Sequence, residues 1–222
     1  MSTWPKIGGA AAVLAAATFV FGFAMFATVL SDYTTGDPSP AESVAFVADN
    51  QTALYIWNLV IYILFGVALV PLALALHERM RRAAPVLTRA ATAFGIIWAG
   101  LVLATGMIAN IGLGTISDLY DVDPTRAEPV WSALDSIQNG LGGGNEITGG
   151  LWVLLISVAA LRTNALPKAL AYLGAVAGVA GLVTIIPPLE VVGAVFGLGL
   201  IVWFVWVGTV MLRDDSGEAV PA

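Results

Sequence analysis

The chain has 222 residues, of which 59% are hydrophobic and only 11% charged, whereas a soluble domain carries about 25% charged residues. This composition favours one membrane-embedded domain over residues 1–222, because no polar segment is long enough to fold separately. The formal net charge of −6 argues against nucleic-acid binding, which needs a basic surface. The lack of cysteine excludes thiolate metal sites, and the single histidine, His77, excludes a three-histidine zinc site.

Six apolar stretches follow one another along the chain. Each is close to the ~20 residues that a helix needs to cross ~30 Å of hydrocarbon. They are apolar throughout, whereas the strands of a membrane β-barrel alternate apolar and polar residues. The sequence therefore predicts an all-α integral membrane bundle of six transmembrane helices joined by short loops. The predicted spans are 7–30, 53–76, 90–113, about 142–161, 169–186 and 189–212.

The first predicted span, 7–30, is an alanine-rich apolar run that follows Lys6, and in this respect it is similar to a secretory signal peptide. Its apolar run is longer than the roughly 7 to 15 residues of a signal core. Removing it would also leave an odd number of spans. We therefore expect this segment to stay in the protein as a transmembrane helix.

Two segments outside the predicted spans carry helix signals. Ser39 precedes Pro40 and stands three residues before Glu42, which is the pattern of a capping box at a helix start. In 127–138, apolar residues recur at helical spacing, and Trp131 suits the headgroup level of a membrane. Both segments are predicted to form short helices that lead into the second and fourth spans.

The basic residues predict the orientation of the bundle. Eight of the nine lysines and arginines lie in loops or chain ends on one side of the predicted membrane, and only Arg126 lies on the other side. By the positive-inside rule, both termini are cytoplasmic. The acidic residues gather in the opposite loops, which we interpret as a solvated surface. The basic residues on the cytoplasmic side are Lys6, Arg79, Arg81, Arg82, Arg89, Arg162, Lys168 and Arg213.

The fourth span has an unusual polar and glycine-rich beginning. The stretch from Ile147 to Leu161 covers only about 22 Å, so the length of the span predicts a helix that starts near Gly142. Glu146 would then lie about one turn inside the membrane. A carboxylate there costs several kcal/mol unless it faces protein or water or takes up a proton, so it should point into the bundle. The glycines 142–144 leave open whether the helix is continuous or broken.

These polar residues define a candidate ligand site with Glu146 at its centre. We predict an outward-facing polar cavity among the second, third and fourth spans, for a small molecule, an ion or a lipid headgroup. Asn58 and Tyr62 are four residues apart and share a helix face. The same side chains could instead have a structural role and form hydrogen bonds between helices. The other candidate lining residues are Asn110, Asp135, Gln138, Asn139 and Asn145.

Small residues four apart indicate close helix packing. Such pairs occur at Gly174 and Gly178 and at Gly193 and Gly197. They favour packing within the chain, and they also leave open an alternative function. In that alternative the protein is a structural or regulatory subunit without a ligand, which docks another membrane protein or a second copy of itself.

An enzyme is the less favoured interpretation. His77 is placed at the cytoplasmic end of the second span, remote from Glu146 and Asp135, so no serine, histidine and acid triad can assemble. A retinal Schiff base is excluded because no span contains lysine. We therefore predict no catalytic residue, no metal and no cofactor. The partner that the sequence predicts is the lipid bilayer.

The second half of the chain carries a set of short motifs. They are Glu146, Trp152, "LR" at 161–162, "LP" at 166–167, "YLG" at 172–174, "AG" at 177–178 and "WFVWVG" at 203–208. In these motifs the chain resembles a family of bacterial six-span membrane proteins known as domain of unknown function four-three-eight-six. The resemblance implies a six-helix fold in a prokaryotic cell (inner) membrane, and it carries no established activity or catalytic residues.

Overall fold

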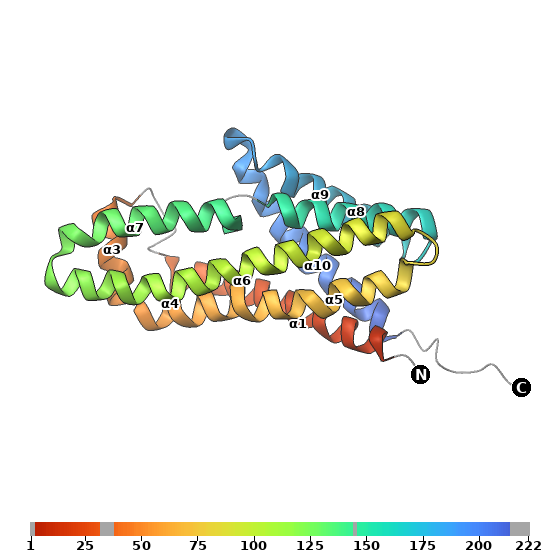
Figure 1. Cartoon of the computed structure of the whole chain (residues 1–222), viewed down its shortest axis with the longest axis horizontal. Helices are drawn as coiled ribbons and strands as arrows, with labels where there is room; N and C mark the ends of the chain where they lie inside the picture. Colours follow the sequence, from red (N-terminus) through yellow and green to blue (C-terminus); the bar gives the residue numbers. More distant parts are fainter. Residues whose placement is uncertain (1–2, 32–37, 144–145, 214–222) are drawn as a thin grey trace, which may run out of the picture.

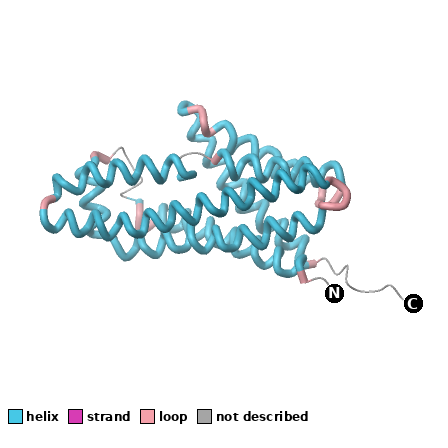
Figure 2. Tube along the Cα trace, viewed as in Figure 1, coloured by secondary structure: helices cyan, strands magenta, loops and turns pink. Residues whose placement is uncertain are grey.

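The computed structural model describes residues 3–31, 38–143 and 146–213, and within these ranges the chain is helical without any strand (Figures 1 and 2). The all-α class is thus confirmed. The helices are α1 (Trp4–Ala27), α3 (Pro40–Asp49), α4 (Gln51–Asn58), the π-helix η1 (Leu59–Leu64), α5 (Phe65–Met80), α6 (Pro85–Val122), α7 (Pro124–Gln138), the π-helical turn η2 (Asn139–Gly143), α8 (Ile147–Thr163), α9 (Lys168–Val183), the 3₁₀ turn η3 (Pro187–Val192) and α10 (Gly193–Leu212).

Five helical runs in the described chain are long and apolar enough to cross a membrane, as expected of a membrane protein. They are Trp4–Ala27, Gln51–Met80, Pro85–Val122, Pro124–Thr163 and Gly193–Leu212. Of these, Pro124–Thr163 includes residues 144–145, which lie outside the described ranges, and a break at Gly142. The remaining predicted span, 169–186, corresponds to the shorter apolar helix α9, whose 16 residues cover about 24 Å.

Six helices form a closed ring in the order α1, α5, α6, α8, α9 and α10, with α10 packed back against α1 (Figure 1). Aromatic side chains fill its centre. The ring of Trp152 lies 5.7 Å from that of Trp98 and 5.6 Å from that of Trp203, measured between centroids, and all three side chains are buried. Around these three tryptophans the bundle interior is therefore closely packed.

The region opposite the termini differs from the prediction of short loops. Helix α6 has 38 residues and is about 57 Å long, nearly twice the ~30 Å of a hydrocarbon core. Its far half packs with α3, α4 and α7 around a second hydrophobic core that includes Val44, Leu113 and Ile116 (Figure 1, left). We call these four segments the helical cap. Loops are replaced by helices here because the apolar faces of α3 and α7 are buried against α6.

The predicted capping box forms at the start of α3. The Ser39 amide donates to the Glu42 carboxylate at 2.8 Å, and the Glu42 amide donates to the Ser39 hydroxyl oxygen at 3.3 Å. Glu42 is exposed. The hydrogen bond from the Ser39 backbone, followed by that from its side chain, lowers the pKa of Glu42 below its ordinary value of 4.5.

The glycine-rich stretch before α8 is a break and not a continuous helix. Gly142 has φ 129° and ψ 14°, which leaves the helical region and which side-chain-bearing residues rarely adopt. Helix α8 begins only at Ile147, and Glu146 precedes it with φ −111° and ψ 32°. The fourth helix thus starts at Ile147 instead of near Gly142, and of the two conformations left open for the glycines, Gly142 adopts the break. The 17 residues of α8 cover about 25 Å, less than the ~30 Å of a hydrocarbon core.

The small-residue pairs are used for contacts within the chain. A Cβ atom on Gly178 would lie 2.7 Å from the Gly150 carbonyl oxygen, so α8 and α9 are in direct backbone contact. A Cβ atom on Gly174 would collide with Ser157 and Trp203, and one on Gly197 would lie 3.2 Å from the Phe23 ring. These faces are therefore occupied by neighbouring helices of the same chain.

Candidate functional site

Hydrogen bonds hold the backbone of Glu146 between two helices, α8 and α9. Its amide donates to the Thr184 hydroxyl oxygen at 2.9 Å, and that hydroxyl donates to the Gly181 carbonyl oxygen at 2.7 Å. The Glu146 carbonyl oxygen accepts from the Gly150 amide at 2.7 Å. The Glu146 backbone is thereby hydrogen-bonded to the end of α9 and to the first turn of α8, which fixes the position of its Cα atom.

The Glu146 side chain is half-buried and lines a cavity of about 240 Å³. The wall comes from α1, α4, η1, α5, α6, η2, α8 and α10, so the cavity lies inside the helix ring. It is bordered by the C-terminal half of α1 and by the start of α10, which places it in the half of the ring away from the chain termini (Figure 1). We call this cavity the Glu146 pocket.

Aromatic residues make up half of the Glu146 pocket's lining. Of the described lining residues, Glu146 is the one with an ionisable carboxyl group, and none is a lysine, arginine or histidine. The indole nitrogen of Trp57 is buried without a hydrogen-bond partner in the described part of the chain. The aromatic lining residues are Phe19, Phe23, Phe26, Trp57, Tyr62, Phe65, Trp98 and Phe196.

Two irregular helical segments shape the wall of this pocket. The π-helix η1, which contributes Ile61 and Tyr62, interrupts the run between α4 and α5. On another side, Gly142 contributes to the wall at the break before α8. Single π-helical turns within α-helices occur often at functional sites, because they re-aim the side chains of one turn.

The structure brings together only some of the residues predicted from the sequence. Glu146 and Tyr62 line the same pocket. Asn58 and Gln138 line a separate cavity of about 70 Å³ in the helical cap. Asn110 lines neither cavity, and its side-chain oxygen is buried without a partner among the described residues.

The remaining predicted residues do not join Glu146. The Asp135 carboxylate accepts a hydrogen bond from the Asn139 side chain at 3.1 Å on an exposed face at the end of α7. Asn145 lies outside the described residues. Instead of one polar cavity among spans two, three and four, Glu146 faces a mainly aromatic pocket that α1 and α10 help to close.

Sequence reasoning missed the aromatic wall. Phe19, Phe23, Trp98 and Phe196 carry no site signal of their own in the sequence. The one available signal was their number within apolar spans. Hydropathy does not tell which of these spans meet in space, so it could not assign them to a pocket.

Comparison with known families agrees with the resemblance noted in the sequence. Residues 7–208 match the family model described as Domain of unknown function (DUF4386). The chain belongs to this family. No curated protein and no solved structure matches this DUF4386 protein significantly. The family assignment therefore identifies relatives without supplying an activity.

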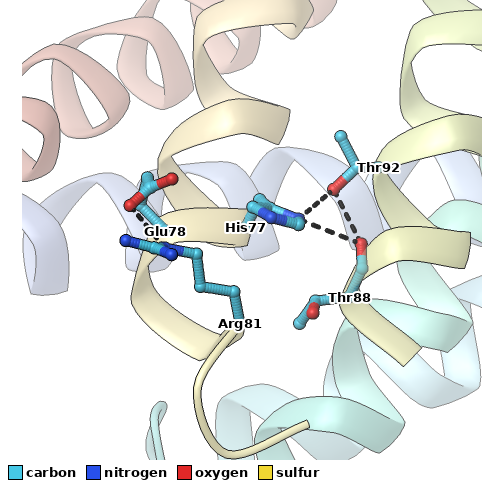
Figure 3. Close-up of polar contacts among 5 residues, drawn as sticks. All are labelled: His77, Glu78, Arg81, Thr88 and Thr92. Carbon is cyan, nitrogen blue, oxygen red and sulfur yellow. Dashed lines mark hydrogen bonds and ion pairs between the residues drawn. The ribbon is translucent and has the colours of Figure 1, made fainter. Parts of the chain in front are cut away.

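His77 of this DUF4386 protein, on α5, contacts α6 (Figure 3). Its Nδ1 atom lies 2.9 Å from the Thr92 hydroxyl oxygen and 3.4 Å from the Thr88 carbonyl oxygen. Because the Thr92 hydroxyl donates to the Thr88 carbonyl at 2.7 Å, both partners accept, and Nδ1 carries the proton. Beside it, Arg81 donates to Glu78 at 2.7 Å. We interpret His77 as a contact between α5 and α6. In the described ranges no three histidine, aspartate or glutamate side chains cluster as metal ligands.

Proposed function

We propose that this DUF4386 protein is a multi-pass protein of the prokaryotic cell membrane that binds a small molecule in the Glu146 pocket. In this proposal all six ring helices cross the bilayer, including the shorter α9. The connections α5–α6 and α8–α9 lie at the same end as the start of α1 and the end of α10 (Figure 1). Eight of the nine basic residues lie in or next to these four places, which supports a cytoplasmic location for that end. The helical cap, with Arg126, would lie outside.

The observation that carries the proposal is the isolation of the Glu146 carboxylate. It makes no hydrogen bond or ion pair with any described residue, although its backbone is held on both sides. A residue with a structural role between helices would form a hydrogen bond to a neighbouring helix through its side chain. A half-buried carboxylate that faces an aromatic pocket is better explained as a group that meets a ligand.

The competing function, a docking subunit without a ligand, has less support. That alternative relied on the small-residue faces as a surface for another protein. Gly174, Gly178 and Gly197 are instead packed against helices of the same chain. No other feature of the described surface favours a particular protein partner.

Ligand binding can be tested with two probes of the same shape, phenyltrimethylammonium and tert-butylbenzene. The purified protein in lipid nanodiscs would be titrated calorimetrically, and the signal of empty nanodiscs would be subtracted. We expect the wild type to bind at least one of the probes. Gly193→Leu should abolish this binding, because Gly193 lines the pocket and a Cβ there meets only Thr184 at 3.5 Å, so the larger side chain has room to enter.

Gly100→Leu is the matched control. Gly100 lies on α6, is exposed, and has no atom within 4 Å of the position of an added Cβ. This variant should bind like the wild type. If neither probe binds to the wild type, or if Gly193→Leu and Gly100→Leu bind equally well, the Glu146 pocket is not the binding site.

A further inference from the structure

The Glu146 pocket also carries information on the kind of ligand, provided that it binds one. We infer that the ligand is an organic cation, namely a hydrophobic amine or quaternary ammonium group. This inference rests on the proposed function and makes it more specific. It comes from the charges, the aromatic wall and the size of the pocket.

The charges of the pocket favour a cation. Glu146 is the one residue with a carboxyl group among the described lining residues, and no basic side chain lies there to pair with it. With a neutral ligand this group would have to stay ionised without a partner, which costs free energy, or take up a proton. An anionic ligand would in addition be repelled. A cation both pairs with the carboxylate and neutralises the pocket.

The aromatic wall distinguishes an organic cation from a metal ion. Cations bind over the faces of tryptophan and tyrosine rings, and recognition of quaternary ammonium groups by aromatic cages is the common use of this interaction. Trp57, Tyr62 and Trp98 are part of the wall. A calcium ion would need six to eight oxygen ligands, and the described lining offers few oxygen-bearing side chains besides Glu146.

The pocket has room for more than a small ammonium ion. A cavity of about 150 Å³ lined by apolar side chains holds benzene. The Glu146 pocket, at about 240 Å³, is larger and carries its carboxylate on one side. A ligand with one cationic group and an apolar body fits both properties.

The two probes of equal shape test the charge directly. Phenyltrimethylammonium and tert-butylbenzene differ in the central atom, nitrogen or carbon, and hence in charge. We expect the cation to bind about tenfold or more tightly, because a desolvated site strengthens cation–π attraction. Benzenesulfonate should not bind. Glu146→Gln, which preserves the shape of the side chain, should weaken binding of the cation about tenfold and leave binding of tert-butylbenzene unchanged.

Asp135→Asn is the control for the loss of a carboxylate, because Asp135 lies at the end of α7 and does not line the pocket. It should bind the cation like the wild type. If both probes bind equally, or if Glu146→Gln binds the cation as well as the wild type does, the inference fails while the proposed function stands. If neither probe binds, both fail.

The cationic group could belong to a free molecule or to a lipid headgroup. Repeating the titration in nanodiscs with a fixed share of phosphatidylglycerol, whose remaining lipid is either phosphatidylethanolamine or an uncharged glycolipid, separates these sources at equal surface charge. A weaker affinity for phenyltrimethylammonium in the ethanolamine discs indicates that the headgroup competes for the site. Equal affinity indicates a free organic cation. In both cases the ligand of the pocket is an organic cation.

Discussion

Gly150 on α8 and Gly178 on α9 face each other so closely that a Cβ on either would lie 2.7 Å from the other's carbonyl oxygen. This contact connects two short ring helices of 17 and 16 residues, and it also supports the site, because Gly150 donates to the Glu146 carbonyl oxygen. Loss of this packing would therefore affect both the fold and the position of Glu146.

Gly178→Val should destabilise the protein by about 1–3 kcal/mol or more, because the new side chain would meet backbone atoms that have no room to move. The measurement is the unfolding midpoint in a dodecyl sulfate titration. Gly100→Val, where the added atoms meet nothing within 4 Å, is the control and should unfold near the wild-type midpoint. Equal midpoints for the two variants would contradict the close contact of α8 and α9.

Gly142→Ala should strain the backbone by about 1–3 kcal/mol, since its positive φ is disfavoured for any residue with a Cβ. Space is not the cause, because nothing lies within 4 Å of an added Cβ there. Gly140→Ala has equally open space without the positive φ and should be neutral or slightly stabilising.

The same pair of variants can be compared by binding. We expect Gly142→Ala to weaken the affinity for phenyltrimethylammonium, because relief of the strain would displace Glu146, four residues further along. Gly140→Ala should keep the wild-type affinity. A Gly142→Ala protein with unchanged stability and affinity would show that the break before α8 is not required.

Thr92→Val should cost about 1 kcal/mol, because it removes the oxygen that accepts from His77 Nδ1 while preserving the shape of the side chain. Thr92→Ser keeps the hydroxyl and should retain the stability. Nitrogen chemical shifts of the imidazole would report the tautomer directly. A proton on Nε2 in the neutral wild-type ring would refute the assigned hydrogen bond.

The start of α3 should lose stability as the pH falls. The pKa of Glu42 is lowered by the Ser39 hydrogen bonds, so their contribution is complete above the ordinary value of 4.5 and disappears as the pH drops through the lowered pKa. Hydrogen exchange of the α3 amides, corrected for intrinsic rates, should show this loss. Glu42→Gln should show a smaller change with pH, and an identical profile for both proteins would contradict the capping box.

Local patterns in the sequence predicted much of the fold. The apolar runs identified the membrane-length helices, and the spacing of Ser39, Pro40 and Glu42 predicted the start of α3. The far end of α6 could not be predicted in the same way. Its apolar run ends near Leu113, but the helix continues to Val122 because Ile116 and Leu119 pack in the core of the cap.

The candidate site was less predictable. The cost of placing a carboxylate in lipid singles out Glu146, and this argument needs only the local sequence. The pocket itself depends on contacts between residues far apart in the chain, such as Phe19 on α1 and Phe196 on α10, which meet only when the ring closes. Glycine tolerates both a helix and a break, so the conformation at Gly142 could not be predicted either.

The length of α6 has a mechanical consequence. Its residues Trp98 and Ala99 belong to the core of the ring, and its residues Leu113 and Ile116 belong to the core of the cap, with no proline between them. The other described connections between ring and cap pass through the irregular segments η1 and η2. Helix α6 thus joins the two cores through one uninterrupted helix, so a tilt of the cap relative to the ring would require α6 itself to bend.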